Sequence, residues 1–344
     1  MRYRLRLGAS IVALASGTVA TAAPSAAEEL TLYCSPQIEW CQVMIEEFQK
    51  ATGIEVAMTR KSSGETFAQI KAEAQNPRAD VWWGGTGDPH LQAAEEGLTE
   101  EYRSPMLDRL HDWAVSQAEA SGYKTVGIYA GALGIGYNKD VLEQKGLPAP
   151  ACWKDLTDPA YAGEIQMPNP NSSGTAYTTL ATLVQLFGED EAFELLKAMH
   201  KNVNQYTKSG SAPIKAAARG ETTIGITFMH DMVTQVVEGF PIEIVSPCEG
   251  TGYEIGSMSI IKGARNPESA RAWYDWALTA DAQELAEKAQ AYQVPSNENA
   301  TPPPESPDLE QIDLIDYDFK KYGSSDERTR LLQKWDEEVY SLPR

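Results

Sequence analysis

Predicted strands and helices alternate along most of the chain, and this alternation constrains the fold more than any other feature of the sequence. In the first third, a short β-rich run is followed three times by small polar residues and then by an amphipathic helical pattern. The three strand and helix pairs are 30–33 with 40–53, 54–58 with 67–74, and 79–83 with 91–97. Because strands joined by crossover helices run parallel under helices on both faces, we predict an α/β fold.

A second lobe is predicted because the same order returns after an interruption. Residues 125–138 are extended and rich in glycine, with no helical period, and strand and helix pairs then recur between 163 and 237. A second extended segment, 253–261, leads back. We interpret 125–138 and 253–261 as crossings between two α/β lobes joined by a hinge.

The crossings divide the chain into two discontinuous units. Lobe 1 is predicted to comprise 28–128 plus 262–344, and lobe 2 to comprise 129–261. Helical patterns at 267–279, 282–290 and 327–340 follow the second crossing. We expect these last helices to pack back on lobe 1.

The N-terminus has the pattern of a secretory signal peptide, predicted over residues 1–27. A basic head precedes 11–23, which carry no charge, and small residues at 25–27 suit cleavage after Ala27. An uncleaved membrane anchor is the alternative, but the apolar run is shorter than the roughly 20 residues that span a bilayer. We therefore expect a periplasmic protein released from its leader.

The net charge limits the binding partners of the protein, and the cysteine content predicts its disulfides. The formal charge of −20 becomes −23 when the leader takes Arg2, Arg4 and Arg6 with it, so we expect no binding to nucleic acid. An oxidising compartment and four cysteines predict two disulfides, but three pairings are possible and the sequence does not choose among them. A metal site is the competing explanation, although no CxxC spacing supports it.

Small polar residues follow several predicted strands, where helix N-termini expose free N–H groups. Hydroxyls and backbone N–H groups at such junctions can hold an anion without Lys or Arg. The alternative is that each side chain only caps its own helix. Asp88 is ambiguous, because a carboxylate beside a bound anion would repel it. The anion-site candidates are Ser62, Ser63, Thr86, Ser172, Ser173, Gly174 and Thr175.

A second group of candidates suits hydroxyl groups. His230 and Asp231 directly follow a buried strand, and Glu254 is a lone carboxylate in the Gly-rich segment 250–257. Carboxylates and an imidazole match vicinal hydroxyls, which both donate and accept. The alternative is that His230 caps its helix and Glu254 faces water. The remaining histidines, which we expect at the surface, are His90, His111 and His200.

Four motifs in order along the chain carry a family resemblance. They are Leu-Thr-Leu-Tyr-Cys-Ser at 30–35, Ala-Asp-Val-Trp-Trp-Gly-Gly at 79–85, Gly-Ile-Gly-Tyr-Asn-Lys-Asp at 134–140 and Tyr-Gln-Val-Pro-Ser-Asn at 292–297. With them the chain resembles the periplasmic solute-binding proteins of ATP-binding-cassette (ABC) importers, in the branch that contains ferric-ion-binding proteins. The resemblance implies a type II periplasmic-binding-protein fold that closes on its ligand, acts as a monomer without a cofactor, and delivers cargo to a membrane permease.

The chain departs from the iron binders at one pair of positions. Those proteins carry adjacent tyrosines where this chain has His230 and Asp231, so ferric ion would lack its principal ligands here and we predict no metal-binding residues. A His-Asp pair followed by a Glu resembles the hexose-phosphate-binding members of the branch. The resemblance implies that His230, Asp231 and Glu254 take sugar hydroxyls, while the Ser/Thr-rich helix starts hold the phosphate.

The predicted function is therefore an extracytoplasmic receptor for a phosphorylated sugar or a similar small organophosphate. Ferric ion, a phosphonate and a polyamine stay open as cargo for the same class of receptor. An enzyme is the rival class, since His230, Asp231 and Glu254 could act as acid, base or metal ligands. Because the sequence has no nucleophile elbow, HExxH motif or P-loop, we expect no catalytic activity.

Overall fold

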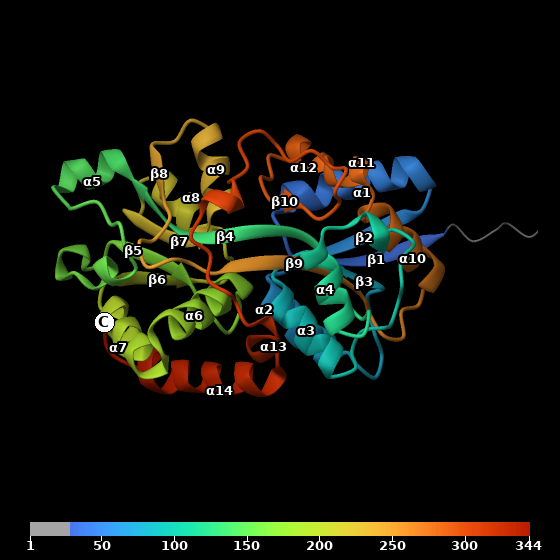
Figure 1. Cartoon of the computed structure of the whole chain (residues 1–344), viewed down its shortest axis with the longest axis horizontal. Coiled ribbons are helices and arrows are strands. Elements are labelled where there is room, and N and C mark those ends of the chain that lie inside the picture. Colours follow the sequence, from blue (N-terminus) through green and yellow to red (C-terminus); the bar gives the residue numbers. More distant parts are fainter. Residues whose placement is uncertain (1–27) are drawn as a thin grey trace, which may run out of the picture.

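The computed structural model describes residues 28–344 (Figure 1). The predicted signal peptide, residues 1–27, lies outside the described residues. Two disulfides are present, Cys34–Cys41 and Cys152–Cys248, as the cysteine count predicted. No helix between residues 28 and 344 is long and apolar enough to cross a membrane.

One ten-stranded sheet runs through the whole molecule, with β2-β1-β3-β9-β4-β7-β5-β6 as its main order. β1 lies parallel to β2 and β3, and β5 lies parallel to β6 and β7. The two remaining strands, β8 and β10, pair with β4. The strands are β1 (Glu29–Cys34), β2 (Glu55–Arg60), β3 (Val81–Trp83), β4 (Val126–Asn138), β5 (Ile165–Pro168), β6 (Val203–Thr207), β7 (Ile224–Phe228), β8 (Ile242–Val245), β9 (Tyr253–Ile260) and β10 (Val294–Pro295).

The long strands β4 and β9 connect the two parallel groups, and Figure 1 shows them side by side across the middle of the molecule. β4 pairs antiparallel with β9 up to Ala132 and then with β7 from Leu133 onward. These strands are the two crossings that the Gly-rich segments predicted. The α/β fold with two lobes is therefore confirmed.

The helices cover both parallel groups and follow from their apolar stripes. In α1, Trp40, Met44 and Phe48 recur every four residues and are buried, and the helix ends at Gly53 in the left-handed region. The longer helices are α1 (Ile38–Thr52), α2 (Ser63–Ala72), α3 (Gly87–Glu95), α4 (Asp112–Ala120), α6 (Gly174–Phe187), α7 (Glu189–His200), α9 (Met229–Val237), α10 (Pro267–Ala277) and α14 (Ser325–Trp335). The shorter helices are α5 (Lys139–Lys145), α8 (Ala212–Ala218), α11 (Ala280–Gln283), α12 (Leu285–Lys288) and α13 (Phe319–Tyr322).

Two large hydrophobic clusters form the cores, one around each parallel group. The first includes Leu32, Trp83 and Trp273, and the second includes Ile226 and Trp335. Trp273 belongs to α10, so this helix packs on the first group, as predicted.

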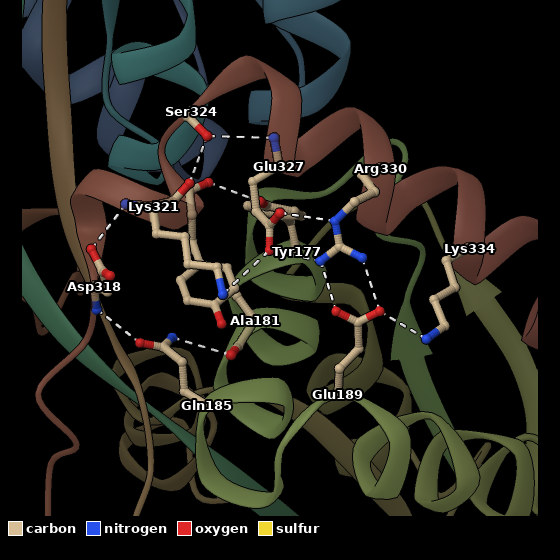
Figure 2. A network of polar contacts seen from close by, with 11 residues as sticks. Tyr177, Ala181, Gln185, Glu189, Asp318, Lys321, Ser324, Glu327, Arg330 and Lys334 are labelled. Carbon is tan, nitrogen blue, oxygen red and sulfur yellow. Dashed lines mark hydrogen bonds and ion pairs between the residues drawn. The ribbon is translucent and has the colours of Figure 1, made fainter.

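The C-terminal helix packs elsewhere than predicted. Leu331, Trp335 and Val339 are fully buried in the second cluster, so the expectation that 327–340 packs on lobe 1 is wrong. Figure 2 shows the polar contacts of residues 318–334 with α6 and α7, where Arg330 binds both carboxylate oxygens of Glu189 at 2.8 and 2.7 Å. The apolar stripe of the helix was visible in the sequence, but its spacing does not say which core it joins.

Two histidines expected at the surface are buried. His90 stacks on Trp82 with ring centroids 3.5 Å apart, and burial lowers its pKa to about 3. His200 is also buried, with Nδ1 bonded to the Tyr206 hydroxyl at 2.8 Å. Both rings lie on the buried face of their helices. The prediction of a surface position is therefore wrong for His90 and His200.

Candidate ligand-binding site

Three helix N-termini meet at one cavity between the two parallel groups. Residues from both parallel groups line this cavity. α2 and α3 start after β2 and β3, while α6 starts after β5, so each N-terminus lies beyond the carboxyl end of a strand. From these starts the cavity is lined by Ser62, Ser63, Gly85, Thr86, Ser173, Gly174 and Thr175.

The side chains at two of these starts do not cap their own helices. Ser62 occupies the N-cap position of α2, but its hydroxyl donates to the Lys208 carbonyl at 2.9 Å. Thr86 occupies the N-cap of α3, and its buried Oγ1 has no hydrogen-bond partner within residues 28–344. Only Ser173 caps its helix, accepting from the Ala176 N–H at a long 3.5 Å. Capping therefore does not account for the hydroxyls of Ser62 and Thr86.

Ser172 is the one predicted residue that does not line the cavity. Its hydroxyl bonds to the Asn169 carbonyl at 3.3 Å, and its own carbonyl accepts from the Glu65 N–H at 3.3 Å. Since Glu65 lies in α2, this contact joins the two sides of the cavity. The structure places Ser172 at an interlobe contact beside the cavity.

Glu254, His230 and Asp231 line another part of the same cavity. His230 and Asp231 lie in the first turn of α9, and Glu254 lies on β9. His230 Nε2 is 3.7 Å from Glu254 Oε1 and 4.0 Å from Asp231 Oδ1. All three side chains are buried, so the alternative that Glu254 faces water is wrong, and so is a capping role for His230, because α9 has no side-chain cap.

Burial shifts the pKa values of Glu254 and His230. It raises the pKa of Glu254 well above its ordinary value, with the nearby Asp231 carboxylate adding to the effect. It lowers the pKa of His230, so this ring is neutral at pH 7. His230 Nδ1 has no hydrogen-bond partner within the described chain. Burial therefore favours the protonated form of Glu254, which can donate, beside an imidazole with one unused nitrogen.

Several lining residues were missed by sequence reasoning. Arg60 is the clearest, because it brings a positive charge to a site expected to manage without one. It stands two residues before Ser62, at the end of β2, so its place in the same junction was the available signal. Gln37, Tyr129, Ser211 and Gln293 also line the cavity and gave no distinct pattern.

Asp88 neither caps α3 nor lines the cavity. Its buried carboxylate accepts from the Tyr317 hydroxyl at 3.0 Å and from the Thr178 hydroxyl at 3.5 Å. Burial raises the pKa of Asp88 to about 6. This contact joins the first turn of α3 to α6 and to the C-terminal segment.

The two sides of the cavity are in close contact. A Cβ atom added at Gly174 would lie 1.8 Å from Thr86 Oγ1, so the starts of α6 and α3 touch directly. Gln37 on one side donates to Asp231 on the other. In this structure the two sides of the cavity therefore touch each other directly.

Comparison with known proteins gives the family. Residues 77–321 match the model of the bacterial extracellular solute-binding proteins. The periplasmic binding protein AfuA from Actinobacillus pleuropneumoniae, solved with exogenous fructose-6-phosphate bound, is 48% identical with a TM-score of 0.90. That alignment covers 92% of this chain and 99% of AfuA.

Two further relatives match along nearly their whole length. The structure of the periplasmic binding protein P5PA is 44% identical with a TM-score of 0.88, covering 91% of this chain and 99% of P5PA. An uncharacterised protein of Haemophilus influenzae is 45% identical over 338 residues, 98% of each chain. The chain therefore belongs to the bacterial extracellular solute-binding proteins and is a periplasmic solute-binding protein of an ABC importer.

Proposed function

We propose that this receptor captures a hexose phosphate, or a similar small organophosphate, between its two lobes and delivers it to the permease. The observation that carries the proposal is one cavity with two chemically different parts. Three helix N-termini line one part, and the His230, Asp231 and Glu254 cluster lines the other. Each part holds a buried polar atom without a partner in the described chain, Thr86 Oγ1 in the first and His230 Nδ1 in the second.

The helix starts suit a phosphate. An N-terminus offers unpaired N–H groups and the positive end of the helix dipole, and three such ends from α2, α3 and α6 add their fields. The hydroxyls of Ser63 and Thr86 can donate to phosphate oxygens, since Ser63 Oγ accepts from the Thr86 N–H and Thr86 Oγ1 has no partner among residues 28–344. A polyamine would place its positive charge against the same dipole ends, which disfavours it.

The His, Asp and Glu cluster suits sugar hydroxyls. The neutral carboxyl of Glu254 can donate and accept, while Asp231 accepts, as it does from the Thr227 hydroxyl at 2.9 Å. His230 contributes its Nδ1, which no other group of the described chain uses. A hydroxyl both donates and accepts, so it can use this mixture, whereas a small phosphonate would leave the cluster unpaired in a buried site.

Ferric ion is disfavoured by the same residues. The positions that carry tyrosines in the iron binders hold His230 and Asp231, and burial favours neutral His230 and Glu254 over the charged ligands that a hard trivalent cation prefers. AfuA, at 48% identity, was solved with fructose-6-phosphate, which supports a sugar phosphate for this chain too.

Lobe closure would couple capture to delivery. Ligand contacts from both lobes favour the closed state, in which Gln37 meets Asp231 and Thr86 meets Gly174. The permease would then receive the closed, loaded form.

A thermal-shift panel tests the proposal. The purified protein, unfolded and refolded to remove retained ligand, is heated with fructose 6-phosphate, glucose 6-phosphate, 2-aminoethylphosphonate, spermidine and ferric citrate. We expect the hexose phosphates to raise the Tm most, and His230→Ala or Glu254→Ala to abolish that shift. A shift with ferric citrate and none with any sugar phosphate would contradict the proposed cargo.

A further inference from the structure

The loop between β1 and α1 is closed by a disulfide and lines the cavity. Cys34 ends β1, Cys41 lies in the first turns of α1, and their disulfide encloses 35–40. Ser35, Pro36 and Gln37 from this loop all line the cavity. The disulfide thus closes a short loop whose residues line the binding site.

Gln37 is the residue of this loop that reaches across the cavity. Its Nε2 donates to Asp231 Oδ1 on the opposite side. Its Oε1 is buried and has no hydrogen-bond partner in the part of the chain described. Gln37 precedes α1 at the N-cap position, yet its side chain makes no cap bond, so helix capping does not explain its orientation. One amide therefore bridges the lobes with its nitrogen and leaves a buried acceptor free.

Arg60 holds the backbone that carries Gln37. Its Nε donates to the Pro36 carbonyl at 2.9 Å, and its Nη2 donates to the Ser35 carbonyl at 3.2 Å. These are the two peptide groups immediately before Gln37. The side chain is partly buried, and burial lowers the pKa of Arg60 while the Asp231 carboxylate opposes that effect. A planar guanidinium can make both bonds at once, which a lysine ammonium cannot do with the same geometry.

Tight packing leaves this loop little freedom. A Cβ added at Gly84 would lie 2.3 Å from Pro36 Cγ, and Gly84 has a positive φ of 75° that favours glycine. The Ser35 N–H also donates to the Trp83 carbonyl at 3.1 Å. The start of the loop is therefore fixed by backbone contacts, and the Gln37 end depends on Arg60 and on the disulfide.

We propose that Gln37 is a cargo-contacting residue and that the Cys34–Cys41 disulfide and Arg60 are its positioning residues. The proposal rests on the proposed function, because it assigns Gln37 Oε1 as an acceptor for a sugar hydroxyl beside Asp231. It also makes the oxidation of Cys34 and Cys41 to a disulfide a requirement for full affinity. The cysteines of neither disulfide line the cavity, but the second disulfide, Cys152–Cys248, closes no short loop on it and supplies the matched control.

Calorimetric titration with fructose 6-phosphate tests the proposal in five proteins: wild type, C34S/C41S, C152S/C248S, Gln37→Ala and the triple variant C34S/C41S/Q37A. We expect Gln37→Ala and C34S/C41S each to weaken binding about tenfold, since a lost hydrogen bond in a buried site has that order of effect. C152S/C248S should change the affinity less than twofold even where it lowers the Tm. The triple variant should bind no more weakly than Gln37→Ala, because the disulfide acts through Gln37.

Additive losses in the triple variant, or unchanged affinity in C34S/C41S, would overturn the positioning role. Arg60→Lys keeps the positive charge but cannot make both carbonyl contacts. We therefore expect it to weaken binding as much as Arg60→Ala does. Full retention of affinity in Arg60→Lys would contradict the role of the two carbonyl contacts. A wild-type protein that binds no sugar phosphate would contradict the proposed function instead. In that case, the exchange of backbone amide hydrogens in residues 35–41 of the ligand-free proteins still tests the positioning role. If C34S/C41S exchanges these hydrogens as slowly as wild type does, the disulfide does not position the loop.

Discussion

The hydroxyl of Tyr317 donates a hydrogen bond to Oδ2 of Asp88 at 3.0 Å, joining the C-terminal segment to the first turn of α3. Asp88 is buried, and its Oδ1 has no hydrogen-bond partner in the described chain. Burial raises the pKa of this carboxyl from 3.8 to about 6. The folded protein therefore binds a proton at Asp88 more tightly than the unfolded chain does.

Replacing Asp88 with asparagine should make the protein more stable at neutral pH. Because the folded pKa is raised, wild type loses stability as the pH rises from about 4 to about 6, and the loss persists above pH 6. The asparagine amide keeps an oxygen for the Tyr317 hydroxyl and carries no charge, so D88N should gain about 1–3 kcal/mol over wild type at pH 7.5. Urea unfolding at pH 4 and pH 7.5 measures the difference. If the free energies of unfolding of wild type and D88N differ by the same amount at both pH values, ionisation of Asp88 does not destabilise the folded protein.

Gly174→Ala should prevent full closure of the lobes. The added Cβ would lie 1.8 Å from Thr86 Oγ1 and 2.9 Å from Thr86 Cβ, an overlap that small side-chain movements do not relieve. We expect the affinity for fructose 6-phosphate to fall at least tenfold, while the ligand-free Tm changes little, since alanine is favoured in a helix. Small-angle scattering at saturating ligand should show the wild type contracting and the variant remaining extended. A contracted variant with wild-type affinity would refute this account of closure.

Glu254 should bind cargo as a neutral carboxyl. Its pKa is raised by burial and by the nearby Asp231 and Asp88 carboxylates, and an incoming dianion favours the protonated form further. The affinity of wild type should therefore fall relative to that of Glu254→Gln as the pH rises, because only wild type can ionise there. At pH 6 we expect Glu254→Gln to bind within about threefold of wild type and Glu254→Ala to lose at least tenfold. Parallel pH profiles for wild type and E254Q would show that this carboxyl does not titrate in the relevant range.

The C-terminal helix should be held mainly by its apolar face. Trp335 is fully buried in the second core, so Trp335→Ala should lower the free energy of unfolding by about 3–5 kcal/mol. Arg330, whose side chain is 46% exposed, pairs with Glu189 on the surface, and Arg330→Ala should cost less than about 1 kcal/mol. Urea unfolding of both variants tests the comparison. A larger loss for Arg330→Ala would mean that the polar network in Figure 2 carries the attachment.

Local sequence patterns predicted the two lobes, because the periodicity of a strand or helix depends only on residues that are close together in the sequence. The crossings at β4 and β9 were recognisable because glycine-rich runs without a helical period disfavour a helix. The attachment of α14 was missed because Leu331, Trp335 and Val339 form a stripe that fits either core, and the choice depends on the path of the chain after β10.

The candidate site was predictable where a small polar residue stands at a junction between a strand and the following helix. Ser62, Thr86 and Ser173 stand at strand-to-helix junctions, beyond the carboxyl ends of strands where ligands bind in α/β sheets. Gln37 could not be recognised, because its role depends on a loop closed by a disulfide whose pairing four cysteines leave open. Arg60 was missed although it stands at the same junction as Ser62. His90 was misplaced because a helical pattern does not reveal that one polar ring stacks on a buried Trp82.

Calorimetric titration of the refolded protein with fructose 6-phosphate, fructose and inorganic phosphate tests the central claim most directly. If one cavity holds a phosphate at the helix starts and hydroxyls at His230, Asp231 and Glu254, the phosphorylated sugar binds at one site per chain and at least a hundredfold more tightly than either half. Equal affinity for fructose and fructose 6-phosphate, or no binding of the sugar phosphate at millimolar concentration, would contradict the account.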